Sequence, residues 1–167
     1  VRVRLGDGTG GFSDAQLFTA GSPFGPYQLV VADFNGDTFL DIFEVYDDVA
    51  VGTSLLMGNG DGTFQSAVFA YSPWLEITAV AVGHFNDDNN MDIVVSLFEW
   101  DSYGGRFQVR LGDGLGGFTG SENDPYQSSL STVDNLAAVD INNDGKLDVV
   151  TAGVTVLLGN GDGTLQN

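Results

Sequence analysis

The stretch Asp33-Phe34-Asn35-Gly36-Asp37-Thr38-Phe39-Leu40-Asp41 determines how the rest of this sequence is interpreted. It places oxygen-bearing side chains at positions one, three, five and nine of a nine-residue loop. Two further copies run from His84 to Asp92 and from Asp140 to Asp148. Each copy lies between two apolar runs, which predicts a repeated unit of strand, acidic loop and strand. The apolar runs are 29–32 and 42–45, 77–82 and 93–97, and 136–139 and 149–150.

This spacing suits Ca²⁺, a hard cation that takes six to eight oxygen ligands at about 2.3–2.6 Å. In a tightly wound loop, positions one, three and five converge on one point. Position seven adds a backbone carbonyl, and the Asp at position nine closes the cage. We therefore predict up to three Ca²⁺ sites, with the one at 84–92 the weakest. The predicted ligands are Asp33, Asn35, Asp37, Phe39 and Asp41; Asn86, Asp88, Asn90 and Asp92; and Asp140, Asn142, Asp144, Lys146 and Asp148, where Phe39, Asn90 and Lys146 contribute carbonyls.

Two other interpretations of these loops compete with a calcium site. Turns rich in Asp and Asn also join strands without any metal, but three copies in register favour a metal site. An EF-hand would need a Glu at position twelve and flanking helices. Position twelve is Glu44, Val95 or Thr151, and the flanking segments are strand-like, so the sequence excludes an EF-hand.

The second copy departs from the pattern because His84 stands where the other copies have Asp. A neutral imidazole is a poorer Ca²⁺ ligand than a carboxylate. We expect weaker binding in this copy, or a water molecule at that position. The alternative is equally open: His84 ends a strand and has no role in metal binding.

The chain has 167 residues, enough for one domain with a hydrophobic core, and it is strongly acidic. Asp and Glu number 23 against 5 Lys and Arg, which gives a net charge of −18. Three bound Ca²⁺ ions, at +2 each, would reduce that charge from −18 to −12. We expect folding to depend on divalent metal, and we expect no affinity for nucleic acid or anionic lipid.

Cysteine is absent, which excludes disulfides, zinc–thiolate sites and thiol catalysis. Calcium sites with dissociation constants of about 10⁻⁴–10⁻³ M are filled only outside the cytosol, so an extracellular or cell-surface location is expected. No apolar run approaches the ~20 residues of a membrane span. The chain begins at Val1 inside a strand-like pattern, which suggests a trimmed or mature piece of a longer protein.

A second motif alternates with the acidic loops. Its four copies, here called the glycine turns, are Leu5–Phe12, Met57–Phe64, Leu111–Phe118 and Leu158–Leu165, at spacings of 52, 54 and 47 residues. Repeats of this period indicate a propeller, a solenoid or an array. Gly supplies positive φ in such turns, and Asp or Asn caps them. No helix or Lys follows as a phosphate-binding loop requires, so nucleotide binding is not expected.

The strand that leads into the third glycine turn alternates between apolar and polar residues. Phe107, Val109 and Leu111 lie on one face, and Gln108 and Arg110 lie on the other. This period of two predicts a half-buried strand.

The repeat length predicts the fold. Each repeat has room for four short antiparallel strands in ~50 residues, which is typical of a propeller blade. A proline–aromatic pair begins each unit, and we interpret it as a rigid turn with a packing aromatic. The pairs are Pro23-Phe24, Pro73-Trp74 and Pro125-Tyr126. We therefore predict an all-β fold made of β-propeller blades of four antiparallel strands, about three blades' worth.

This prediction divides a single repeat array, 1–167, into four units: the last two strands of one blade in 1–24, whole blades in 25–73 and 74–125, and three strands of a further blade in 126–167. Such an array is incomplete as a closed ring. Its open strand edges would pair with further blades of a longer chain or with other copies head to tail.

The sequence resembles a known family over essentially its whole length. Residues 31–37 with Asp41-Ile42, residues 139–145 with Asp148-Val149, and the glycine turn at 58–64 resemble the FG-GAP repeats, also described as VCBS repeats. These occur in integrin α-subunit propellers and in many secreted bacterial proteins. The resemblance implies a β-propeller, Ca²⁺ in each acidic loop, and a role in adhesion, often to protein or carbohydrate.

Three functions were weighed. The first is a non-enzymatic, calcium-stiffened extracellular scaffold for adhesion or assembly. The second is a lectin-like propeller, in which the long loop with Glu99, Trp100, Asp101 and Tyr103 contacts a sugar. An enzyme is disfavoured, because the chain has one His, no Cys and no isolated carboxylate pair outside the acidic loops.

Overall fold

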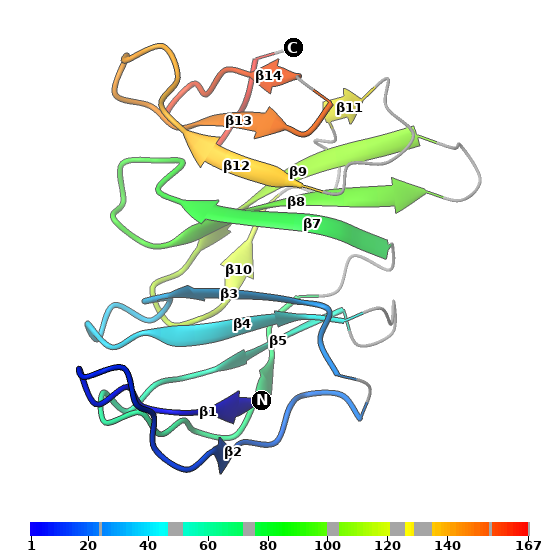
Figure 1. The fold of residues 1–167 in the computed structure, drawn as a ribbon. Helices are drawn as coiled ribbons and strands as arrows, with labels where there is room; N and C mark the ends of the chain where they lie inside the picture. The colour runs from blue at the N-terminus through cyan, green and yellow to red at the C-terminus, as the bar shows by residue number, and fades with distance from the viewer. Residues whose placement is uncertain are drawn as a thin grey trace.

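The protein is all-β, as predicted, in a computed structural model that describes residues 1–23, 25–46, 52–71, 76–99, 104–120, 126–128, 135–153 and 155–166. The described residues form strands joined by turns and contain no helix. Accordingly, that part of the chain has no helix that could cross a membrane. Figure 1 shows the sheets stacked one above another in chain order, from β1 and β2 near the N-terminus to β12, β13 and β14 near the C-terminus.

The sheets are antiparallel, and within each sheet consecutive strands are hydrogen-bonded neighbours, except that β11 pairs with β9. None of them closes into a barrel, which fits incomplete propeller blades. The first sheet contains β1 (Arg2–Val3) and β2 (Gln16–Leu17). The second contains β3 (Gln28–Ala32), β4 (Asp41–Val45), β5 (Thr53–Leu56) and β6 (Val68–Phe69). The third contains β7 (Glu76–Gly83), β8 (Asp92–Glu99), β9 (Gly104–Gly112) and β10 (Phe118–Thr119), with β11 (Tyr126–Ser128) also paired to β9. The fourth contains β12 (Leu136–Val139), β13 (Asp148–Thr151) and β14 (Val156–Leu157).

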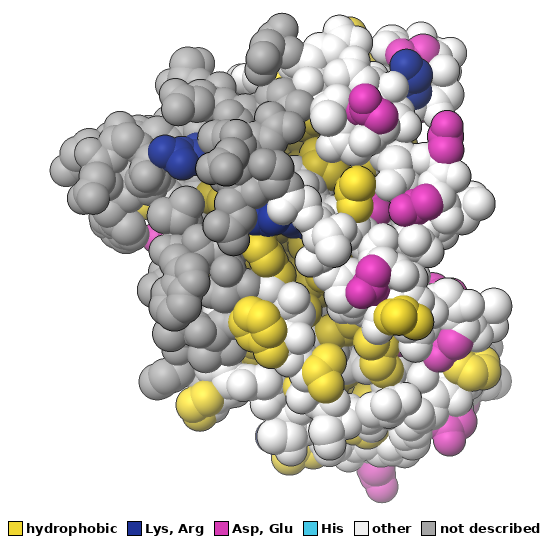
Figure 2. Space-filling view, turned by 180° about the vertical axis from the view of Figure 1, so that it is seen from behind, with side chains coloured by type: hydrophobic (Ala, Val, Ile, Leu, Met, Phe, Trp, Pro, Cys, Tyr) yellow, Lys and Arg dark blue, Asp and Glu magenta, His cyan; other side chains and the backbone are white. Residues whose placement is uncertain are grey.

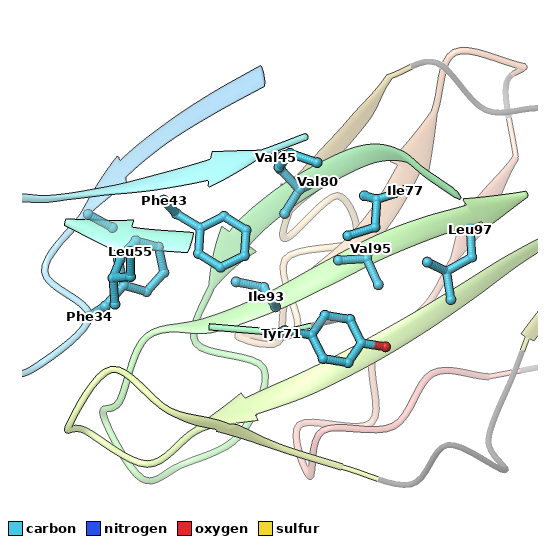
Figure 3. Packing of buried hydrophobic residues seen from close by; sticks show 11 residues of the cluster. Phe34, Phe43, Val45, Leu55, Tyr71, Ile77, Val80, Ile93, Val95 and Leu97 are labelled. Carbon is cyan, nitrogen blue, oxygen red and sulfur yellow. The ribbon is translucent and has the colours of Figure 1, made fainter. Parts of the chain in front are cut away.

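The hydrophobic core lies between neighbouring sheets rather than inside any one of them. One cluster joins the second sheet to the third, with Phe43, Val45 and Leu55 facing Val80 and Ile93 (Figure 3). A second cluster joins the third sheet to the fourth. Strands β4 and β5 are buried on both faces, because sheets or connecting segments cover each side of the second sheet. Each blade is therefore stabilised mainly by its neighbours, as expected of a repeat array.

Aromatic packing reinforces the junction between the second and third sheets. Phe34, which follows β3, and Phe43 of β4 lie next to Phe118 of β10. The ring centroids are 5.6–5.9 Å apart, and Phe118 meets the other two rings edge to face. Such contacts add to area burial by about 0.5–1.5 kcal/mol per pair.

Strand β9 differs from the sequence-based expectation of a half-buried strand. Phe107 is buried as predicted, but Gln108 and Arg110 are also buried, at 5% exposure each. Their face is covered by Tyr71, from the segment after β6, whose hydroxyl donates to Gln108 Oε1 at 2.8 Å. Arg110 Nη2 donates to the Tyr71 hydroxyl at 2.8 Å, and the guanidinium lies 4.5 Å from the ring centroid. The alternation was read correctly, but the polar face contacts the neighbouring sheet instead of water.

The predicted strands flanking the acidic loops are present, and the absence of flanking helices confirms that these loops are not EF-hands. The predicted unit boundaries stay a prediction. Strand β11 pairs with β9 of the preceding sheet, although it lies just beyond the boundary at residue 125. Of the three proline–aromatic pairs, Phe24, Pro73, Trp74 and Pro125 lie outside the described residues.

Candidate metal-binding loops

The three acidic loops lie on one edge of the molecule, together with the glycine turns (Figure 1, left). Each loop leaves the first strand of a sheet and ends where the second strand begins at position nine, Asp41, Asp92 or Asp148. Seen from behind, acidic side chains run along this edge (Figure 2). We call residues 33–41, 84–92 and 140–148 the first, second and third loops.

The Asp at position nine is fully buried in all three loops, at 0% exposure. In the first loop, Asp41 Oδ2 accepts from Phe34 N at 2.9 Å and Oδ1 accepts from Gly58 N at 2.8 Å. The equivalent donors are Phe85 and Gly112 to Asp92, at 2.7 and 2.9 Å, and Ile141 and Gly159 to Asp148, at 3.1 and 2.8 Å. One carboxylate thus joins the loop to the end of the third strand in the second, third and fourth sheets.

Burial governs the acidity of two of these groups. Loss of solvent raises the pKa of Asp41 and of Asp92, and the hydrogen bonds from Gly58 and Gly112 oppose the rise without cancelling it. The negative charges of Asp37 and Asp33 add to the upward shift of the Asp41 pKa. A cation placed among these oxygens would relieve both the desolvation and the repulsion.

Positions three and five form the same bonded pair in each loop. In the first loop, Asn35 Nδ2 donates to Asp37 Oδ2 at 2.9 Å, and Asp37 N donates to Asn35 Oδ1 at 3.0 Å. The pairs Asn86–Asp88 and Asn142–Asp144 repeat this arrangement within 0.1 Å. The backbone amide at position seven then donates to the position-five carboxylate at 2.8–2.9 Å. Two of the predicted donor side chains are therefore side by side before any ion is present.

Position one is an Asp cradled by backbone amides in the first and third loops. Asp33 accepts from the amides of Gly36, Asp37 and Thr38 at 2.8–3.2 Å. Asp140 accepts from the amides of Asp144 and Gly145 at 3.1 and 2.9 Å. Left-handed backbone at positions four and six aims these amides inward, with φ of 73° and 74° at Gly36 and Thr38.

The residues of the first and third loops fit a hard divalent cation by the chemistry of their donors: two loop carboxylates, a buried carboxylate, an Asn oxygen and a backbone carbonyl. Among the described residues, no three His, Cys, Asp or Glu side chains converge as a metal-holding group. The position-one and position-nine carboxylates instead face backbone amides. Carboxylate oxygens have further lone pairs, so the same side chains could accept amide hydrogen bonds and a cation together.

The second loop differs where the sequence differs. The ring of His84 does not point to the loop amides; its Nδ1 lies 2.8 Å from the backbone carbonyl oxygen of Asn90. Asn86, Asp88 and Asp92 hold the same positions as their counterparts. Here the hydrogen bond from the Asn90 amide is the main cause that lowers the pKa of Asp88.

The glycine turns contribute to the loops in a way that the sequence-based interpretation missed. Gly58, Gly112 and Gly159 donate the amides that bind the position-nine carboxylates. A Cβ on these residues would lie 2.1–2.2 Å from the carbonyl oxygen of Leu40, Met91 or Leu147, at position eight. Only glycine allows this approach, so the acidic loop and the glycine turn form one site. The regular spacing between the two motifs was the available signal.

The other candidate ligand contacts are not placed together by the structure. Trp100, Asp101 and Tyr103 lie outside the described residues, and Glu99 ends β8 with only its backbone described. Glu44, at position twelve of the first loop, is buried in β4, where its Oε2 accepts hydrogen bonds from the hydroxyls of Tyr46 and Ser54. It is therefore not a loop ligand.

Comparison with known proteins places this arrangement in a family. A family model described as an FG-GAP-like repeat matches residues 1–44 and 84–151. The two matched segments include all three acidic loops and two of the four glycine turns. No curated protein matches the chain.

Proposed function

Because the chain belongs to the FG-GAP-like repeat family, a family of non-enzymatic β-propeller-like modules, we propose that it is a calcium-binding extracellular scaffold for adhesion or assembly. One observation carries this proposal: in all three loops an Asn at position three and an Asp at position five stand beside a fully buried Asp at position nine, and the first and third loops add an Asp at position one. Such a set costs free energy when no cation is present, because buried carboxylates lose solvation.

The residues that would hold the ion are clearest in the first and third loops. Asp33, Asp37 and Asp41 supply carboxylate oxygens in the first loop, with Asn35 and the carbonyl of Phe39. Asp140, Asp144, Asp148, Asn142 and the carbonyl of Lys146 do so in the third. The bound ion would supply positive charge that ties two strands of a blade together. Hydrogen bonds within the loops already fix the loop backbone, so binding an ion would cost little further conformational entropy.

Extracellular placement follows from the proposed sites, because loops of this kind would be filled only where Ca²⁺ is about millimolar. The partner would be a protein or glycan bound at the surface, or another blade of the same type. The net charge of −18 supports a role for divalent cations in keeping the acidic edge compact.

Calorimetric titration with Ca²⁺, paired with thermal melting, tests this proposal. Millimolar Ca²⁺ should raise the free energy of unfolding by about 1–3 kcal/mol through mass action, and a chelator should reverse the effect. Asp37→Ala and Asp144→Ala should each remove one binding event. Asp14→Ala, which removes an exposed acid outside the loops, is the matched control and should leave binding unchanged. Absence of any binding heat, with melting indifferent to chelator, would refute the proposal.

A further inference from the structure

The second loop is closed by a direct hydrogen bond between the two positions that a cation would bridge. His84, at position one, has its Nδ1 at 2.8 Å from the carbonyl oxygen of Asn90, at position seven. A carbonyl only accepts hydrogen bonds, so Nδ1 must carry the proton. In the other two loops the structure shows, among the residues it describes, no hydrogen bond to the carbonyl of Phe39 or Lys146.

The backbone of the second loop also differs from that of the first and third loops, at position four. Position four has left-handed φ in the first and third loops, at Gly36 (73°) and Asn143 (62°). Asp87 occupies this position in the second loop and does not have positive φ. Position six has left-handed φ in all three loops, at Thr38 (74°), Asn89 (62°) and Gly145 (86°), so this difference is at position four. In the second loop the Asp88 amide donates to Asn86 Oδ1 at 3.0 Å.

Asn90 is anchored on its other side as well. Its Nδ2 donates to the carbonyl of Gly112 at 3.3 Å, and a Cβ on Gly114 would lie 2.6 Å from its Oδ1. The carbonyl that accepts from His84 thus belongs to a residue packed against the glycine turn of the same sheet. Moving that carbonyl onto an ion would break the His84 bond and disturb this packing.

From these contacts we propose that the second loop is a metal-independent copy, in which the His84–Asn90 hydrogen bond takes the place of the cation. The chain would bind two Ca²⁺ ions, in the first and third loops, and not three. The predicted number of two ions rests on the proposed function of the first and third loops. The structure of the second loop does not, because the His84–Asn90 hydrogen bond would maintain it with or without Ca²⁺.

Calorimetric stoichiometry gives the first test. The wild-type chain should bind two Ca²⁺ ions. His84→Asp combined with Asp87→Gly should restore the donor and the position-four backbone and raise the number to three. The reciprocal change in the third loop, Asp140→His, should lower it to one. A wild-type stoichiometry of three would overturn the proposal.

Nitrogen-15 NMR of the imidazole gives the second test, which does not depend on metal binding elsewhere. His84 is the one histidine in the chain, so its ring signals need no assignment by mutation. The spectrum in chelator should show the Nδ1–H tautomer, and saturating Ca²⁺ should leave its shifts unchanged. An Nε2–H tautomer, or a ring shift on adding Ca²⁺, would overturn the proposal. If no Ca²⁺ binds at all, the proposed function fails, while the tautomer still decides the role of His84.

Discussion

The Asp at position nine shows how much a single residue does in this fold. Asp41, Asp92 and Asp148 are wholly buried, and each accepts hydrogen bonds from two backbone amides in different segments. A buried carboxylate is costly unless such donors compensate it, and bonds to a charged acceptor are worth about 1.5–3 kcal/mol each. The amides offset part of the desolvation cost, but the pKa of Asp41 and of Asp92 stays raised, so a bound cation would stabilise their ionised form further.

Exposed Asp residues in the glycine turns work differently. Asp61 Oδ1 accepts from the Thr63 hydroxyl at 2.6 Å and from the Thr63 amide at 2.9 Å, and these bonds lower the Asp61 pKa below its ordinary 3.8. Since the folded pKa is the lower one, the contribution to stability is present above pH ~3.8 and is lost as the pH falls through the folded value.

Thr63→Val should therefore raise the pKa of Asp61 toward 3.8, because it removes the hydroxyl donor and keeps the backbone amide. Carboxyl-carbon NMR titration measures this directly. Asp162, which bonds Thr164 in the same way, is the internal control and should titrate as in the wild type. An unchanged Asp61 pKa in the variant would contradict the assigned cause.

The sequence predicted which residues of the loops carry oxygen, but not which atoms those oxygens contact. Loop spacing puts Asp33, Asp37 and Asp41 in one loop, and their convergence on a cation stays a prediction. The bond from Gly58 to Asp41 depends on how the third strand returns along the second. Contacts of that range are set by packing of the sheet and not by the nine residues themselves.

Between elements, a repeated contact links each sheet to the next. A glycine of one glycine turn lies against an apolar side chain of the preceding sheet: a Cβ on Gly62 would lie 2.6 Å from Leu5, and one on Gly163 would lie 2.8 Å from Leu111. Gly10 holds the same place in the first turn, with positive φ, and a Cβ there would meet nothing within 4 Å.

This pair isolates the contribution of the contact between sheets. Gly163→Ala and Gly10→Ala both place Ala at positive φ (85° and 98°), so both carry backbone strain. Only Gly163→Ala also forces a methyl into Leu111, and it should cost about 1–3 kcal/mol more in free energy of unfolding. Urea denaturation of both variants provides the measurement. If both variants lose the same free energy of unfolding, the contact between Gly163 and Leu111 does not contribute to stability.

The polar network on β9 makes a second prediction for the junction between the second and third sheets. Tyr71→Phe keeps the ring over Arg110 but leaves Arg110 Nη2 and Gln108 Oε1 without the hydroxyl. The free energy of unfolding should fall by about 1–3 kcal/mol.

The control is a double variant, Tyr71→Phe with Arg110→Met, which replaces the charge with an apolar side chain. It should recover part of the loss, because it removes the buried charge, whose remaining hydrogen bonds are to Gln108 Oε1 at 3.1 Å and to the Gly120 carbonyl at 2.8 Å. If the double variant is less stable than the sum of the single changes, the network is not the source of the effect. Equilibrium denaturation of all three variants completes the cycle.

Element boundaries followed from the sequence wherever apolar and polar residues alternate or where an acidic loop marks a strand end. Strand β4 was expected at 42–45 and runs from Asp41 to Val45. The burial of Gln108 and Arg110 was not predictable, because it depends on Tyr71 approaching from the neighbouring sheet. The pairing of two separate strands, β10 and β11, with β9 was likewise not predictable from the alternation of apolar and polar residues.

At the scale of the whole molecule, an apolar groove is open between the first and second sheets. Leu29 and Val31 of β3 are 47% and 53% exposed. Val31 lines this groove of about 450 Å³ together with Leu5, Phe39 and Leu40. Apolar side chains also join the sheets elsewhere in the stack, so strands of a further blade of the same type are the occupant that the groove fits.

We therefore expect the chain to self-associate as its concentration rises, in the presence of Ca²⁺, with Val31→Lys weakening the association at least tenfold. Val68→Lys is the matched control, since Val68 is equally exposed, at 50%, but lies on the outer strand β6. Sedimentation velocity over a range of concentrations gives the measurement. A wild-type chain that stays monomeric throughout, or two variants that behave alike, would contradict this expectation.

The spacing of the motifs predicted a repeated all-β fold, and the described residues form several antiparallel sheets in chain order. The number of blades in a complete ring could not be predicted from the sequence, because the side chains packed between neighbouring sheets set the angle between them. Phe43, Val80 and Ile93 fix one such angle, and their sizes carry no explicit count of blades.

The bonds around Phe85 have a mechanical consequence. Its amide is held by Asp92, while its carbonyl accepts from Gly163 in the turn of the next sheet, at 2.8 Å. Tension applied to the third sheet would therefore reach the fourth through the hydrogen bond between Gly163 and Phe85, whose amide the Asp92 carboxylate holds. A pulling force on either of these two sheets would be shared with the other.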